Sequence, residues 1–181
     1  MRLAIELANT LHARQGEIRD ELQAPADLAA WLDAAEPLFA VPVDSPRVSR
    51  TDLAAARDLR DALRAIAVAA SAGRAADRAD IERLNAAART APRWQELASD
   101  AKTVTARHDG KPVPGALAEV AADAVDLLAT GRLGVCAAPG CVLLFLRDRP
   151  NREWCGNACG NRARVARHHD RQKQPASPRG K

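Results

Sequence analysis

All four cysteines of the chain lie in its last quarter, in two close pairs. Four residues separate Cys136 from Cys141, three separate Cys155 from Cys159, and thirteen residues join the pairs. Two close pairs of thiolates are the usual ligand set of a tetrahedral structural zinc site. A Pro-Gly pair before Cys141 favours a tight turn, and the i, i+4 spacing of the second pair would put both sulfurs on one face of a helix. The spacing therefore predicts one bound Zn²⁺.

Two disulfides are an alternative use of four cysteines, and they require an oxidising compartment. The chain begins Met1-Arg2, and Glu6, Asn9 and His12 interrupt the apolar run that an export signal would need. We therefore expect a cytoplasmic protein with reduced thiols. Unrelated buried thiols, the third interpretation, would not gather in one quarter of the chain. Because all four positions are sulfur, no coordination position is left for a substrate, which indicates a structural zinc.

The residues around the cysteines carry a second signal. The run Arg132-Leu-Gly-Val leads into Cys136, Leu144-Phe follows the first pair, and Trp154 precedes the second pair, which ends in Cys159-Gly-Asn-Arg. This pattern resembles the CGNR zinc-finger family, which is named after those last four residues. The N-terminal run Leu-Ala-Ile-Glu-Leu-Ala-Asn-Thr, residues 3–10, is similar to the opening of the ABATE domain that precedes the finger in that family. The resemblance implies a bacterial stress-induced transcription regulator.

Composition favours helices over a β-sandwich. Apolar residues make up 47% of the chain but aromatic residues only 3%, so the core must pack mainly through Leu, Ala, Val and Ile. No apolar run approaches the ~18–20 uncharged residues of a membrane span. Apolar residues recur at helical spacing in four segments, and a β-branched stretch followed by Asp-Gly predicts a strand or hairpin. The four helical segments are 27–33, 53–70, 77–88 and 117–128, and the β-branched stretch is 102–107.

We therefore predict a mainly α fold with a small β component. An α-rich domain, acting in sensing or assembly, is expected over residues 1–131. A small four-cysteine zinc finger of the knuckle–hairpin–helix type is expected over 132–172, and a disordered basic tail over 173–181. Within the finger, we expect the helix to start at or near Cys155.

The sequence leaves two features of the N-terminal domain open: the secondary structure of residues 3–8 and the role of Asn9. Residues 3–8 fit a short strand or the start of a helix, and the family resemblance favours a strand that could pair with the 102–107 segment. Asn9 is a candidate ligand-binding group, although a cap or turn is the commoner role. In the 53–70 helix, Thr51-Asp52 is expected to form the cap and Arg57–Asp61 an i, i+4 ion pair.

Charge is distributed unevenly along the chain. Residues 132–181 contain eleven Lys and Arg against three Asp and Glu, whereas residues 1–131 contain sixteen against twenty. A basic module on an acidic body is typical of nucleic-acid binding and predicts double-stranded DNA as a partner. A basic solvated tail is the plainer interpretation of the same charge.

Helical geometry divides the basic residues of the finger between two faces. At ~100° per residue, Arg162 lies within about 20° of Cys155, so we expect Arg162, together with Asn161, to support the metal ligands. The residues predicted to contact DNA are on the opposite face or in the preceding loop: Arg164, Arg167, His168, Arg171, Arg152 and Arg149. Trp154 is expected to pack against the metal site. Glu153 stands where the family pattern has a basic residue.

The sequence thus predicts a zinc-containing, DNA-binding transcription regulator whose N-terminal domain senses a small-molecule effector. The alternative is a zinc-stabilised module that binds proteins or RNA without reading a DNA sequence. An enzyme is not expected, because the chain has no phosphate-binding glycine loop and no HExxH motif, and His108-Asp109 fits a turn. The oligomeric state stays open, with a homodimer as one option.

Overall fold

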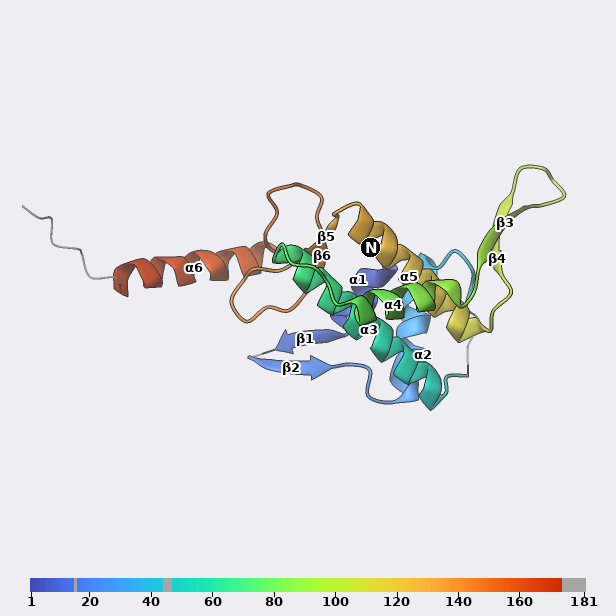
Figure 1. The fold of residues 1–181 in the computed structure, drawn as a ribbon, viewed down its shortest axis with the longest axis horizontal. Helices are drawn as coiled ribbons and strands as arrows, with labels where there is room; N and C mark the ends of the chain where they lie inside the picture. The colour runs from blue at the N-terminus through green and yellow to red at the C-terminus, as the bar shows by residue number, and fades with distance from the viewer. Residues whose placement is uncertain (15, 44–46, 174–181) are drawn as a thin grey trace, which may run out of the picture.

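The computed structural model describes residues 1–14, 16–43 and 47–173 (Figure 1). The helices are α1 (Leu3–Asn9), α2 (Pro25–Ala35), α3 (Arg50–Ser71), α4 (Arg78–Arg89), α5 (Pro112–Ala129) and α6 (Asn157–Lys173), with a short 3-10 turn at Glu36–Leu38. Three antiparallel hairpins pair β1 (Leu11–Arg14) with β2 (Glu17–Asp20), β3 (Arg93–Leu97) with β4 (Val104–His108), and β5 (Leu133–Val135) with β6 (Leu144–Leu146). The predicted mainly α fold with a small β component is confirmed.

The main core forms where α1, α3 and α5 pack against one another. Leu7, Leu63, Val120 and Leu127 are almost completely buried there, together with many alanines. Alanines let helix backbones approach closely, which explains how a chain with few aromatic residues fills its core. Helix α4 packs on α3 and α5, and α2 packs on α3.

Two local predictions are corrected by the structure. Residues 3–8 belong to helix α1, because Leu3, Ala4, Leu7 and Ala8 are all buried and recur at the helical rather than the strand period. The predicted strand is confirmed as β4, but its hairpin partner is β3, which precedes it, so Asp109-Gly110 leads toward α5 and does not form the hairpin turn. In the described part of the chain the two strands pair only with each other. The predicted pairing of this hairpin with residues 3–8 is therefore wrong.

The N-cap of helix α3 lies two residues before Thr51, where the cap was expected to begin. Ser49 is the N-cap: its hydroxyl accepts a hydrogen bond from the Asp52 amide at 3.1 Å. Asp52 in turn accepts from the Ser49 amide at 2.8 Å, which completes a capping box. Asp52 thus takes part in the capping box, as the third residue of the helix rather than as the N-cap.

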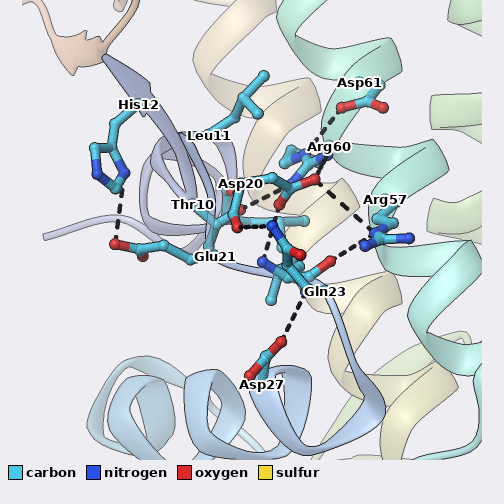
Figure 2. Close-up of polar contacts among 12 residues, drawn as sticks. Thr10, Leu11, His12, Asp20, Glu21, Gln23, Asp27, Arg57, Arg60 and Asp61 are labelled. Atoms are coloured by element: carbon cyan, nitrogen blue, oxygen red, sulfur yellow. Dashed lines mark hydrogen bonds and ion pairs between the residues drawn. The ribbon is translucent and has the colours of Figure 1, made fainter. Parts of the chain in front are cut away.

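A buried ion pair ties α3 to the β1–β2 hairpin (Figure 2). Arg60 is only 3% exposed, and its two terminal nitrogens donate to the carboxylate oxygens of Asp20 at 2.5 and 3.0 Å. Arg60 Nε donates to Asp61 at 2.8 Å, while Arg57 Nε donates to the Leu22 carbonyl at 2.6 Å. Asp61 is therefore the partner of Arg60, and not of Arg57 as its spacing suggested.

The β5–β6 hairpin lies between two hydrophobic clusters. Leu133 and Leu144 point into the main core, whereas Phe145 belongs to a second cluster with Cys136 and Cys159. The Phe145 ring covers Gly134, where an added Cβ would lie 2.7 Å from the ring. One short hairpin thus connects the helical body to the cysteine cluster.

The predicted basic tail is only partly within the described residues. Lys173 is the last residue of α6, and 174–181 lie outside the described residues. Across the described ranges, none of the helices combines the length and the apolar character needed to cross a membrane.

Candidate metal centre

The structure brings the four cysteine sulfurs together. All four Sγ atoms lie within 4.8 Å of one another. Cys141 Sγ is 3.9 Å from Cys155 Sγ, which is 3.4 Å from Cys159 Sγ. A tetrahedral site with Zn–S bonds of ~2.3 Å requires sulfurs about 3.8 Å apart. The four sulfurs therefore fit one zinc ion, and no fifth ligand is needed.

The two cysteine pairs are positioned by different local structures. Cys136 directly follows β5, and its amide donates to the Leu143 carbonyl at 3.0 Å. A turn then brings Cys141 back, with Gly140 at φ +70°, a conformation that favours glycine. Cys155 precedes α6 and Cys159 lies in its first turn. The helix was expected to start at or near Cys155; it starts two residues later, at Asn157, so that Cys159 is the one cysteine ligand on it.

The electrostatics of the cluster require a cation. Burial raises the pKa of the Cys155 thiol, and the sulfurs of Cys159 and Cys136 raise it further. Burial also acts to raise the pKa of Cys136, but hydrogen bonds from the amides of Cys155 and Ala138 outweigh it, so this pKa lies below its ordinary value. Four thiolates this close repel one another. Zn²⁺ supplies the positive charge that lets all four be deprotonated.

Arg162 lies beside the sulfurs, on the face that helical geometry indicated. Its Nη2 donates to Cys159 Sγ at 3.2 Å. A guanidinium here offsets part of the net negative charge of zinc with four thiolates. Asn161, predicted to act with it, instead accepts a hydrogen bond from Arg164 on the exposed side of the helix.

Arg152, predicted to contact DNA, holds the loop before the second cysteine pair. Its guanidinium donates to the carbonyls of Trp154 at 3.1 Å, Leu146 at 3.4 Å and Cys155 at 2.8 Å. It also lies 5.0 Å from the centre of the Phe145 ring. These contacts engage every nitrogen of the side chain, so Arg152 fixes the loop around the metal site.

Trp154 packs against the cysteine cluster, as predicted. Its ring lies over Gly160, where an added Cβ would come within 3.3 Å of Cε3. The guanidinium of Arg167 lies 5.5 Å from the ring centre. The close approach of Trp154 explains why a glycine stands inside α6.

The remaining predicted residues are spread along the finger. Arg149 is exposed in the loop after β6, and the other four are exposed on α6. The four on α6 are Arg164, Arg167, His168 and Arg171. The structure thus brings Arg164 to the same hollow as Arg149 and Arg152, while Arg167, His168 and Arg171 lie further along α6.

Asn9 joins the helical body to the finger. The side-chain Nδ2 of Asn9 donates to the Leu144 carbonyl at 3.0 Å, and its Oδ1 accepts from the Leu144 amide at 2.9 Å. The side chain thus makes the two hydrogen bonds that a neighbouring β-strand would make. Both polar atoms of the side chain are therefore engaged, and a ligand contact by Asn9 stays a prediction.

Arg64 makes a similar connection that sequence reasoning missed. Its guanidinium donates to the Val142 carbonyl at 2.7 Å, and also to the carbonyls of Ala8 at 2.7 Å and Leu11 at 3.2 Å. Helical spacing puts Arg64 outside the apolar stripe of α3, but spacing along one helix does not indicate which distant segment covers that face.

We expect the Asn9→Ala variant to be less stable by about 1–3 kcal/mol, because the amide and carbonyl of Leu144 lose their partners in a partly buried place. Urea unfolding of the zinc-loaded chain measures this change. Asn85→Ala on α4, whose side chain has no hydrogen bond among the described contacts, is the control and should shift stability by less than ~0.5 kcal/mol. Equal stabilities for the two variants would contradict the role assigned to Asn9.

The geometry agrees with the comparisons to known proteins. Residues 1–131 match the ABATE family model, described as "Putative stress-induced transcription regulator", and residues 132–172 match the CGNR zinc finger. No curated protein was found to match the chain. The chain is thus a two-part zinc-finger protein. It belongs to the ABATE family and carries a C-terminal CGNR zinc finger, whose four clustered cysteines form a site for one structural Zn²⁺.

Proposed function

We propose that this zinc-binding regulator acts by binding double-stranded DNA through its finger, while the N-terminal body receives a small-molecule signal. The observation that carries the proposal is the exposed basic surface of α6. Helix α6 starts at the metal site and extends away from the helical body (Figure 1). With 17 residues it is about 25 Å long. A helix of this kind fits the major groove of B-DNA.

The basic side chains of α6 are held by contacts within the helix that leave their charge free. Arg167 Nε donates to the Ala163 carbonyl at 3.4 Å, and Arg171 Nε donates to the Arg167 carbonyl at 3.3 Å. Both guanidiniums keep their terminal nitrogens for phosphate or base edges. His168 lies between them and contacts Gln172 at 2.9 Å. These contacts preorganise the helix surface without neutralising its charge.

Binding to a protein or RNA is the second candidate, and one residue favours it. Val165 is 57% exposed in the middle of the basic helix. An exposed apolar side chain within a basic surface is typical of a contact with another protein. Selection from a random duplex-DNA pool by the zinc-loaded chain, at rising salt, separates these functions. An enriched, salt-resistant sequence supports the regulator, and weak binding without enrichment favours the second candidate.

We expect the Arg167→Glu, Arg171→Glu double variant to bind the selected duplex at least about tenfold more weakly, because two phosphate contacts become repulsive. Fluorescence anisotropy with labelled DNA measures the affinity, and the salt dependence of binding should become shallower. Zinc content should not change, since neither side chain touches a cysteine sulfur in the described contacts.

The matched control makes the same charge change elsewhere. Arg83 and Arg89 lie on α4 and are 57% and 63% exposed. Arg83→Glu, Arg89→Glu should leave affinity within about twofold, because surface charges away from the contact act weakly. If both double variants weaken binding equally, α6 is not the contact surface.

A further inference from the structure

A second feature of the finger lies between its loop and the start of α6. A hollow of about 430 Å³ opens there, large enough for a small ligand or a phosphate group with its sugar. Its walls include Asp148, Arg149, Arg152, Trp154, Asn157 and Arg164. The hollow therefore differs from the basic surface further along α6, since neither Arg167 nor Arg171 lines it.

The charge inside the hollow is positive. Of its three arginines, Arg152 is paired with the one carboxylate, that of Asp148, at 3.3 Å. The guanidinium of Arg152 also donates hydrogen bonds to three backbone carbonyls, so it is a fixed part of the wall. Two positive charges remain on Arg149 and Arg164. The Arg149 side chain has no hydrogen bond or ion pair among the described contacts, and the Arg164 side chain donates from Nη2 to the side-chain oxygen of Asn161.

The rest of the wall is fixed and adds to the attraction for anions. Trp154 is held between the cysteine cluster and Gly160. The Gly160 amide donates to the Gly156 carbonyl at 3.1 Å, which makes Gly156 the residue before the first turn of α6. A glycine at this place has no side chain to cover the first amides of the helix. The positive end of the α6 dipole therefore faces the hollow, at Asn157.

We propose that this hollow is a phosphate-binding site, with Arg149 and Arg164 as the two cationic contacts. The phosphate can come from the backbone of bound DNA or from a soluble nucleotide, because the same guanidinium donors recognise both. The first source rests on the proposed DNA binding, and the second does not. Bidentate guanidinium contacts next to a helix N-terminus favour phosphate over chloride at equal ionic strength.

The test follows the indole N–H signal of Trp154 in ¹⁵N-labelled, zinc-loaded full-length protein. Titration with inorganic phosphate, and separately with a nucleoside 5′-monophosphate, should shift this signal saturably. Sodium chloride at the same ionic strength should not. We expect Arg149→Ala, Arg164→Ala to weaken phosphate binding at least about tenfold, since two charge-assisted contacts are lost. Arg83→Ala, Arg89→Ala on α4 removes the same charge and should leave it unchanged.

A repeat titration with duplex DNA present separates the two sources. Loss of the phosphate response indicates that a backbone phosphate already fills the hollow, and a retained response indicates a site for soluble nucleotides. A response equal to that of chloride, or one that the double variant keeps, overturns the proposal. Phosphate binding is measured without DNA, so it stands even if α6 fails to bind duplex DNA.

Discussion

Replacing Cys155 with serine is expected to release the zinc ion and unfold the outer part of the finger while the helical body stays folded. A serine hydroxyl does not replace a thiolate ligand, and structural zinc supplies the free energy that folds small metal modules. Cys155 Sγ lies 3.9 Å from Cys141 Sγ and 3.4 Å from Cys159 Sγ, so its loss removes the link between the two pairs. Helix α6 and the loop around Trp154 then lose the cluster on which they pack.

The extent of unfolding is limited by the β5–β6 hairpin. Leu133 and Leu144 are buried in the main core, and Asn9 holds β6 from the other side. We therefore expect hydrogen exchange to become fast in residues 147–173 and to stay slow in α3 and α5. Zinc analysis and circular dichroism measure the loss of metal and of the α6 signal.

Ala158→Ser is the control for the Cys155 variant. It adds a hydroxyl at an exposed position in the first turn of α6, three residues after Cys155, without removing a ligand, so zinc and helicity should be kept. Chelation of the wild-type protein should reproduce the exchange pattern of Cys155→Ser. A serine variant with full zinc and full helicity would refute the structural role of the site.

The Asp20→Ala variant is expected to lose about 3–5 kcal/mol of stability, because it leaves the buried charge of Arg60 without its main partner. Figure 2 shows the Asp20 carboxylate facing the guanidinium of Arg60. Asp61 remains within 2.8 Å of Arg60 Nε, but its side chain is 59% exposed and compensates poorly. Thermal and urea unfolding measure the change.

The same ion pair predicts how stability depends on pH. Burial acts to raise the pKa of Asp20, but hydrogen bonds from Arg60 and the Leu22 amide, with the nearby positive charges, outweigh it. The pKa in the folded state is therefore below its unfolded value. Such a group contributes stability that is fully present above the unfolded pKa, about 4, and is lost as pH falls through the folded pKa. Wild-type stability should fall in that acid range, and Asp20→Ala should show a smaller fall.

Glu82→Ala is the control for Asp20→Ala. Glu82 and its partner Arg89 are 65% and 63% exposed, and exposed pairs contribute at most about 1 kcal/mol. If Asp20→Ala lowers the free energy of unfolding no more than Glu82→Ala does, the Arg60 charge must be compensated without Asp20. The buried ion pair would then not hold the β1–β2 hairpin to α3.

The features that could be predicted from the sequence are those that depend on the spacing of nearby residues. The cysteine pairs, the apolar stripes of α3 and α5 and the β-branched stretch of β4 each depend on residues a few positions apart. The side of α6 that carries Arg162 follows from helix geometry in the same way. Such signals are strong because the local backbone fixes which side chains are neighbours.

The features that were missed depend on distant contacts or on competing local signals. Asn9 and Leu144 are 135 positions apart, and no spacing rule connects an asparagine side chain to a strand formed so far along the chain. Residues 3–8 are too short for a clear period, so a resemblance outweighed the pattern and gave the wrong element. The first turn of α6 is delayed to Asn157 because Gly156 is a poor helix former.

The attachment of α6 has a mechanical consequence. In the part of the chain that the structure describes, α6 packs on the cluster of cysteines, Phe145 and Trp154 at its first turns, and its far end is about 25 Å from that cluster. A rotation of the cluster by about 10° would move the far end sideways by roughly 4 Å, more than the ~3.4 Å between successive base pairs of DNA. Asn9 links β6 to the body, and Arg64 links Val142, just before β6, to it. In the proposed DNA complex, a small displacement of this segment would change which bases the helix reaches.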